Sequence, residues 1–321
     1  MRRYRRIHHL PLLVMLAVPG LVACVSHSDW RETIAENQFE HSWVAGYGFS
    51  HLVVDNGHDM VDGRLHVYIE GDGTPWIGRT EISADPTPGH ALMLEAMALD
   101  EAAAVYIGRP CYFGRHSDPG CGPPVWTFER YSEAVVRSMC AVAQRIAQNK
   151  NALEIILFGH SGGGTIAVLM MACTPSVRIV TTVAAPLDTS AWANAHEYTP
   201  LYGSLNPATQ LLRRQAEELH LTGGEDIVTP PGTNEGYFQT RPWTRTMQVP
   251  DAGHIDCWVA LWPRVLLRVA QLSAGTDELE PLTCDSVQDS ILEPSASRTG
   301  AQGLGPTIHF LLLKKPSTIF G

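Results

Sequence analysis

This chain of 321 residues lacks the sequence patterns that are typical of binding to nucleic acids, metals and nucleotides. No basic cluster follows the first six residues and the formal net charge is −10, which argues against a nucleic-acid partner. There is no C-x-x-C or H-E-x-x-H spacing, so we expect no zinc site. There is also no G-x-G-x-x-G, and no lysine follows the glycine-rich run as a P-loop requires. We therefore expect neither a metal nor a cofactor.

Charged residues are few, at 17%, whereas hydrophobic residues make up 45% of the chain. This balance is typical of a globular protein with a sizeable core and not of a disordered one. No internal repeat is present, and the length allows one large domain or two small ones.

The N-terminus predicts export. Arginines at positions 2, 3, 5 and 6 precede the apolar stretch Leu10–Val22, which is too short to stay in a bilayer as a spanning helix. The next residues, L-V-A-C, resemble the lipobox of bacterial lipoproteins, which implies cleavage after residue 23 and a lipid on Cys24. Val25 rather than Asp then resembles lipoproteins sorted to an outer membrane. An ordinary secretory signal with a chance cysteine and an uncleaved anchor are the alternatives.

Export makes disulfides possible among the other cysteines. Cys111 and Cys121 flank a loop rich in Gly, Pro and Asp, and we expect a bridge between them that stabilises the fold by about 2–3 kcal/mol. Cys257 and Cys284 form a weaker candidate pair. The cysteines at positions 140 and 173 fall within apolar helical patterns, which predicts buried free thiols.

The most informative stretch is Ile155–Thr165, which reads I-I-L-F-G-H-S-G-G-G-T. A short apolar run before glycine indicates a buried strand, and the apolar residues after the glycines indicate a helix. Between them lies the spacing G-x-S-x-G, which is typical of a nucleophile elbow. Ser161 is therefore the candidate nucleophile. The alternatives are a glycine-rich turn with no chemistry and a phosphate-binding loop.

Strands and helices alternate on both sides of this stretch. Expected strands lie at Leu65–Ile69, Ala102–Ile107 and Val177–Ala185, and amphipathic helices lie at 128–146 and 258–272. This order predicts an α/β fold in which helices flank a mostly parallel central sheet.

The alternation of strands and helices is interrupted at 188–219, where aromatic residues and prolines lie among polar ones. We interpret this segment as a small cap over the site, whose aromatic residues could contact an apolar substrate. The alternative is a long connection with one helix near Pro207–Leu219, in which the aromatic residues simply pack the loop.

A serine nucleophile needs a base, and the base needs a carboxylate to orient it. Asp226 and His254 follow Ser161 in that order, and each comes just after an expected strand. Parallel strands bring such positions to one edge of the sheet. Glu225 and Asp188 are rivals for the role of the carboxylate.

The chain resembles the α/β-hydrolases from about residue 65 to 272. The motifs that carry the resemblance are G-H-S-G-G at Ser161, G-x-x-D-x-V-x-P at Asp226 and A-G-H at His254. The resemblance implies a nucleophile, an acid and a general base at these positions, and an oxyanion hole formed by the backbone N–H groups of Gly162 and Asp72.

One departure concerns the oxyanion turn. Glu70-Gly71-Asp72 replaces the His-Gly that is common in this fold, and its carboxylates would oppose a developing negative charge unless they point away. His160, next to the nucleophile, is expected to be structural.

Four regions follow from these patterns: a signal peptide at 1–23, a linker with a short helix at 24–42, a hydrolase domain at 43–274 and a tail at 275–321. The predicted function is an exported, lipid-anchored serine hydrolase that cleaves an ester or related acyl bond of a small or lipid-like substrate. Thioesters, amides and peptides suit the same machinery. A hydrolase-like lipoprotein that only binds is the alternative from another class.

Overall fold

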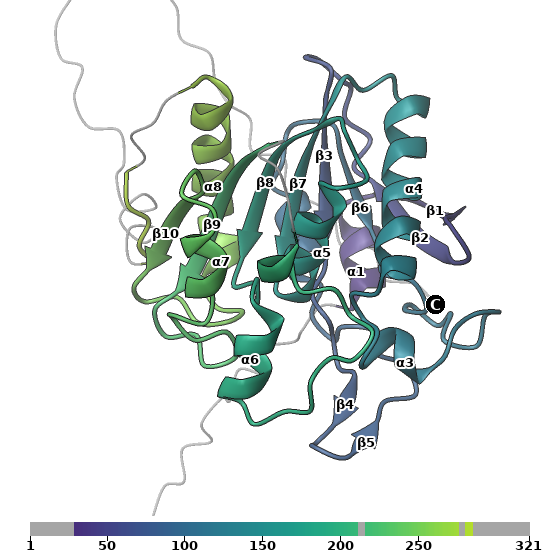
Figure 1. Cartoon of the computed structure of the whole chain (residues 1–321). Helices are drawn as coiled ribbons and strands as arrows, with labels where there is room; N and C mark the ends of the chain where they lie inside the picture. Colours follow the sequence, from purple (N-terminus) through teal and green to yellow (C-terminus); the bar gives the residue numbers. More distant parts are fainter. Residues whose placement is uncertain (1–28, 211–215, 276–279, 285–321) are drawn as a thin grey trace, which may run out of the picture. The chain divides into compact units, whose positions relative to one another are not determined.

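The computed structural model describes residues 29–210, 216–275 and 280–284 (Figure 1). The predicted signal peptide and Cys24 lie outside these residues, as does nearly all of the predicted tail. No helix within the described ranges has the length and apolar character needed to cross a bilayer.

An eight-stranded sheet forms the centre of the structure, in the order β1-β2-β6-β3-β7-β8-β9-β10. Strands β6, β3, β7, β8, β9 and β10 run parallel to one another, and β1 and β2 add an antiparallel hairpin at one edge. The bounds are β1 Glu40–Ala45, β2 Ser50–Asp55, β3 Arg64–Ile69, β6 Ala104–Ile107, β7 Glu154–His160, β8 Val177–Val183, β9 Glu217–Gly223 and β10 Arg245–Val249. The expected α/β class with a mostly parallel sheet is confirmed.

Helices cover both faces of the sheet because its strands are apolar on both sides. On β3, Val67 and Ile69 belong to a buried cluster with α4 (Glu133–Asn149) and α5 (Gly162–Met170). Tyr68 points to the other face, where its ring packs against Trp262 of α8 (Trp258–Ser273). The alternation along one strand thus assigns each helix to its layer.

Shorter elements complete the fold at the carboxyl ends of the strands and at the sheet's periphery. They are α1 Trp30–Glu36, the small hairpin of β4 Trp76–Ile77 and β5 Glu81–Ile82, α2 Leu92–Met97, α3 Pro123–Trp126, α6 Thr189–Ala195, the 3-10 turn Pro207–Thr209 and α7 Glu235–Gln239. Strand β1 begins at Glu40, so the folded sheet starts three residues before the expected boundary at 43.

The helix placed near Pro207–Leu219 in the alternative interpretation is wrong at both of its ends. A 3-10 turn forms at Pro207–Thr209 and strand β9 begins at Glu217, while residues 211–215 lie outside the described residues. Leu219 and Leu221 belong to strand β9, which lies between β8 and β10. A short apolar run suits either element, and its neighbours in the sheet decided the outcome here.

Three disulfides fasten the structure: Cys111–Cys121, Cys140–Cys173 and Cys257–Cys284. The expectation of free thiols at Cys140 and Cys173 is wrong, because α4 packs against α5 and brings Cys140 to the chain segment that follows α5. Disulfides of this number indicate an oxidising compartment.

Candidate active site

Ser161 lies at the sharp turn between β7 and α5. Its backbone is in an unusual conformation for a residue with a side chain, with φ of 51° and ψ of −127°. The turn is also crowded, since a Cβ on Gly163 would overlap with the backbone of Ile69. Glycine is therefore required there, and the G-x-S-x-G spacing has a local structural reason.

Asp226 and His254 follow the carboxyl ends of β9 and β10 and meet Ser161 at that edge of the sheet. His254 Nε2 lies 3.1 Å from Ser161 Oγ, and His254 Nδ1 lies 2.9 Å from Asp226 Oδ2. The Nδ1–H donates to the carboxylate, which leaves Nε2 free to accept the serine proton. The structure therefore brings the three predicted residues into one hydrogen-bonded series.

The carboxylate of Asp226 is buried and held in its charged form. Burial raises its pKa, but the hydrogen bond from His254 and those from the N–H groups of Thr229 and Val228 outweigh burial and lower it. Its rivals have other surroundings. Asp188 accepts the N–H groups of Ser190 and Ala191 at the start of α6, and Glu225 is exposed.

The turn after β3 lies against the nucleophile. A Cβ on Gly71 would come 3.2 Å from Ser161 Cβ, and a Cβ on Gly162 would overlap with the carboxylate of Asp72. The two residues proposed as oxyanion donors, Gly162 and Asp72, are therefore neighbours beside Ser161.

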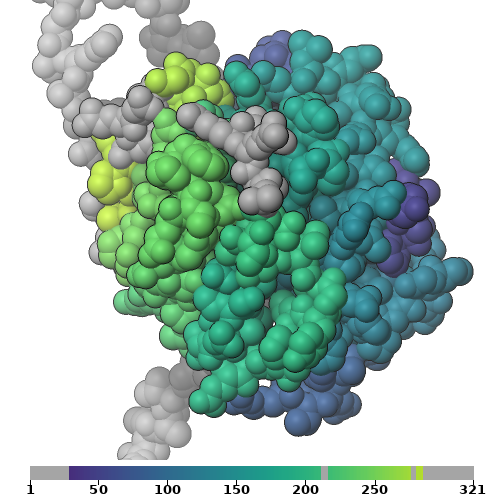
Figure 2. Space-filling model, viewed as in Figure 1, coloured from purple at the N-terminus to yellow at the C-terminus, as the bar shows by residue number. Residues whose placement is uncertain are grey.

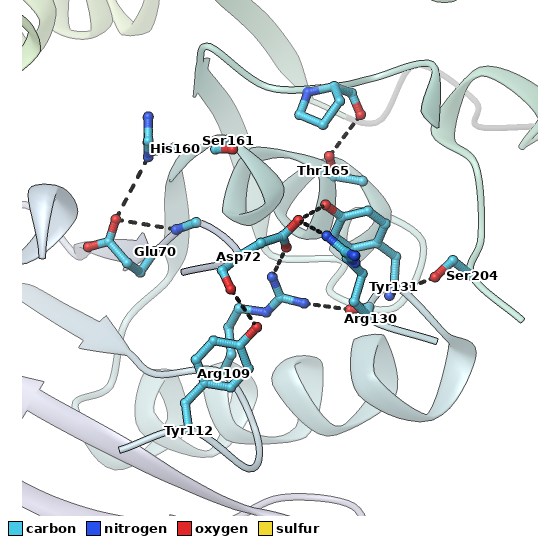
Figure 3. A network of polar contacts seen from close by, with 12 residues as sticks. Glu70, Asp72, Arg109, Tyr112, Arg130, Tyr131, His160, Ser161, Thr165 and Ser204 are labelled. Atoms are coloured by element: carbon cyan, nitrogen blue, oxygen red, sulfur yellow. Dashed lines mark hydrogen bonds and ion pairs between the residues drawn. The ribbon is translucent and has the colours of Figure 1, made fainter. Parts of the chain in front are cut away.

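The Asp72 carboxylate is bound by basic and hydroxyl groups (Figure 3). Arg109 donates to Oδ1, while Arg130 Nη1 and Tyr131 Oη donate to Oδ2 at 2.8 and 2.6 Å. Burial raises the pKa of Asp72, but the two guanidinium groups and Tyr131 outweigh it and hold this pKa far below its usual range. One carboxylate faces two buried cations, so the cluster below the oxyanion turn carries a positive excess.

Glu70, the other carboxylate of the turn, also points into the protein. It accepts the N–H groups of Gly71 at 3.2 Å and Met93 at 2.9 Å. Its Oε1 also lies 3.8 Å from His160 Nδ1 (Figure 3). His160 Nε2 in turn lies 2.8 Å from the carbonyl oxygen of His254. His160 thus connects the oxyanion turn to the loop of the candidate base.

Sequence reasoning missed Arg109 and Arg130. Arg109 comes two residues after β6 ends, at the edge where Ser161, Asp226 and His254 also lie, and this position is a signal that could have identified it. Arg130 lies within the segment 128–146 that was expected to be helical, but α4 begins only at Glu133, and the tertiary structure places Arg130 against Asp72. The Cys111–Cys121 bridge closes the loop that follows Arg109.

A second serine–histidine contact lies elsewhere in the protein. His51 Nε2 is 2.7 Å from Ser138 Oγ, and His51 Nδ1 is 2.9 Å from the carbonyl oxygen of Gly108. Both side chains are completely buried, and a backbone carbonyl takes the place of the carboxylate. No substrate can reach this pair, and we assign it a structural role.

A cavity of about 330 Å³ opens beside the oxyanion turn. It is lined by Gly73, Trp76 and others of the β4 region, by Phe128, and by Trp192 and Tyr198 of the segment that was expected to form a cap. A larger cavity of about 730 Å³ lies where β3, β7, β8, β9 and β10 begin, at the opposite edge of the sheet from Ser161. The smaller cavity is therefore the candidate substrate site.

Comparisons with known proteins agree with this topology. An esterase of Pyrococcus furiosus superposes with a TM-score of 0.52 at 11% identity, over 74% of this chain and 93% of the esterase. A protein of unknown function from Agrobacterium tumefaciens superposes with a TM-score of 0.52 at 12% identity, over 76% of this chain and 100% of that one. A puromycin-hydrolysing peptidase of Mycobacterium tuberculosis gives 0.50 at 15%, over 72% of this chain and 40% of the peptidase. No protein-family model and no curated sequence matches. The chain has the α/β-hydrolase fold.

Proposed function

We propose that this protein is a serine hydrolase that cleaves a carboxylic ester, with Ser161 as nucleophile, His254 as general base and Asp226 as the orienting carboxylate. The observation that carries the proposal is the series of hydrogen bonds from Ser161 through His254 to the buried Asp226. The series stands at a strained elbow, and a cavity begins at Gly73, directly after the oxyanion turn. Both features suit nucleophilic acyl transfer.

In the first half of the reaction, Ser161 Oγ attacks the ester carbonyl carbon while its proton passes to His254 Nε2. The resulting tetrahedral intermediate collapses, the bond to the alcohol oxygen breaks, and His254 returns the proton to the departing alcohol. In the second half, His254 takes a proton from water, whose oxygen attacks the acyl-enzyme carbonyl. Collapse breaks the bond between the acyl carbon and Ser161 Oγ, His254 returns the proton to that oxygen, and the carboxylic acid leaves.

The oxyanion formed in each half is assigned to the backbone N–H groups of Gly162 and Asp72, each worth about 3–4 kcal/mol in well-studied hydrolases. Both acidic side chains of the turn are turned inward and bonded, so neither opposes this charge. The positive excess from Arg109 and Arg130 beneath the turn favours it further.

Labelling with a fluorophosphonate, followed by mass mapping of the adduct, tests the assignment. We expect an adduct on Ser161 that is absent in Ser161→Ala and strongly reduced in His254→Ala. Ser138→Ala is the matched control, because among the described residues it removes the other serine hydroxyl that is bonded to a histidine, and it should leave labelling intact. A folded wild-type protein without an adduct would contradict the proposal and favour the binding lipoprotein. Parallel assays with an ester, a thioester and an anilide decide the bond that is cleaved.

We also propose that the protein is exported and held to the cell envelope by a lipid on Cys24. The three disulfides support an oxidising compartment, and the lipobox-like residues before Cys24 support the anchor. The mass of the N-terminal peptide tests it directly. Cys24→Ala should move the protein from the membrane fraction to the soluble fraction, and a peptide that lacks lipid would contradict the anchor.

A further inference from the structure

The cavity of about 330 Å³ begins close to the nucleophile. Gly71 packs against Ser161, and Gly73, which lines the cavity, is only two residues away, or at most about 7.6 Å along the chain. A group bound in this cavity is therefore within reach of Ser161 as one part of the ester that is cleaved. Figure 2 shows the two walls side by side, the β4–β5 region in blue and the cap in green.

The walls of the cavity are aromatic. Trp76 and Phe128 pack edge to face at 5.7 Å on one side, and Trp192 and Tyr198 do so at 5.4 Å on the other. Flat apolar walls of this kind suit a flat apolar group, since stacked and edge-to-face rings gain energy beyond the area they bury.

The cap wall is fixed before any substrate arrives. Trp192 Nε1 donates to the carbonyl oxygen of Val228 at 2.7 Å, and His196 Nε2 lies 2.8 Å from the same oxygen. The His196 ring also stacks on Tyr198 at 5.0 Å. Val228 lies two residues after Asp226 in the loop of the candidate acid, so the cap and the catalytic machinery form one unit. A cavity that is already formed loses less freedom on binding.

The cavity also carries positive charge. Two arginines, Arg79 and Arg130, are among its lining residues, and no lining residue is acidic. Arg130 is bonded to Asp72. Arg79 instead lies with its guanidinium carbon 5.7 Å from the Tyr198 ring centroid, and no carboxylate of the described residues forms an ion pair with it. An unneutralised guanidinium above an aromatic wall is suited to a planar carboxylate.

We propose that the cavity selects esters in which an aromatic group carries a negative charge, with the ring between the aromatic walls and the carboxylate on Arg79. The inference rests on the proposed ester hydrolase and adds the class of substrate. The chain has a net charge of −10, so on average the protein repels anions. The cavity differs from this average because its charged lining residues are arginines.

The test compares pairs of esters that differ only in the carboxylate. The acyl-side pair is the monomethyl ester of benzene-1,4-dicarboxylic acid against methyl benzoate, and the alcohol-side pair is 4-carboxyphenyl acetate against phenyl acetate. The ratio of kcat/KM, charged over neutral, should exceed one for at least one pair, and the pair that shows it identifies the side of the ester that enters the cavity. The ratio should fall as salt rises from about 0.05 to 0.5 M, because the Debye length decreases about threefold over this range.

Substitutions of lining residues test whether the cavity causes the charged-over-neutral ratio of kcat/KM. Arg79→Ala should lower it about five- to tenfold, and Arg79→Lys should lower it less because the charge remains. The matched control is Arg137→Ala, which removes another arginine that lies over an aromatic ring, Tyr47, but does not line the cavity. Trp192→Ala should lower kcat/KM for both aromatic esters of a pair relative to kcat/KM for methyl acetate.

Binding gives a readout that does not depend on turnover. In Ser161→Ala, the charged ester should quench tryptophan fluorescence at a lower concentration than the neutral one, and adding Arg79→Ala should abolish this difference. Equal ratios in wild type and Arg79→Ala, together with equal binding of charged and neutral esters, would overturn the inference. Failure of Ser161 labelling would instead overturn the proposed hydrolase, so the two failures are distinguishable.

Discussion

Two serine–histidine pairs in this chain have similar distances but differ in the third partner of the histidine, in the neighbouring oxyanion turn and in access. Ser161 and His254 are 3.1 Å apart, and Ser138 and His51 are 2.7 Å apart. The first pair stands at the edge of the sheet, has Asp226 behind the imidazole and has an oxyanion turn beside it. The second is sealed between β2 and α4, and its histidine is bonded to a carbonyl. A short contact between serine and histidine is therefore no evidence of a nucleophile until its third partner and its access are known.

The largest expected difference between the pairs lies in the histidines. His254→Ala should lower kcat for an activated ester by about 10⁶-fold, because it removes the imidazole that is bonded to Ser161 Oγ and takes its proton. His51→Gln should leave kcat within about threefold, since it acts on no substrate. Hydrolysis of a 4-nitrophenyl ester measures both, and circular dichroism checks the fold. Similar losses in the two variants would remove the distinction drawn here.

The carboxylate behind His254 should have the next largest effect. Asp226→Asn keeps the shape of the side chain but favours the wrong imidazole tautomer, and we expect kcat to fall by about 10⁴-fold. Asp188→Asn is the control, because Asp188 is the rival acid and caps α6 instead. If Asp188→Asn caused the larger loss, the assignment of the acid would be wrong.

The buried cluster beneath the oxyanion turn should control stability. Asp72→Asn leaves Arg109 and Arg130 buried without a counter-charge, which should cost about 3–5 kcal/mol of unfolding free energy. Urea unfolding measures it, and Asp62→Asn, in a half-exposed pair with Arg64, should cost less than about 1 kcal/mol. Adding Arg130→Met to Asp72→Asn should restore part of the loss. No recovery would mean that the charge excess is not the cause.

The buried pair of His51 and Ser138 should affect how the free energy of unfolding depends on pH. Burial lowers the pKa of His51 to about 4, against an ordinary value of 6.5. Below pH 6.5 the unfolded chain binds a proton that the folded protein resists, so stability falls between pH 6.5 and 4, by about 3 kcal/mol in total. His51→Gln should flatten this part of the curve. An unchanged slope in that variant would show that other groups cause the loss.

The elbow could be predicted from the sequence because its cause is local. Ser161 needs a buried strand before it, a helix after it and glycines beside it, and all of these are indicated within residues 155–171. Asp226 and His254 could be placed near it because parallel strands expose their carboxyl ends at one edge. The fold class followed in the same way from the alternation of strands and helices.

Other features depended on contacts between distant segments. Cys140 and Cys173 were expected to be free thiols, since an apolar helical pattern says nothing of which helix lies next to it. The strand at Glu217–Gly223 was partly mistaken for a helix because its apolar run is short and only β8 and β10 beside it select the extended form. Each outcome was decided by a neighbour that the local pattern does not contain.

By itself, the sequence determined the elbow, the order of the candidate catalytic residues and the alternating architecture, since strand and turn preferences act over a few residues. Only the tertiary structure decided that the Asp72 carboxylate turns inward onto Arg109 and Arg130, and that Arg79 stands over an aromatic wall. The physical reason is that Coulomb attraction and ring packing act through space, and these partners are brought together by the sheet and not by their spacing in the chain.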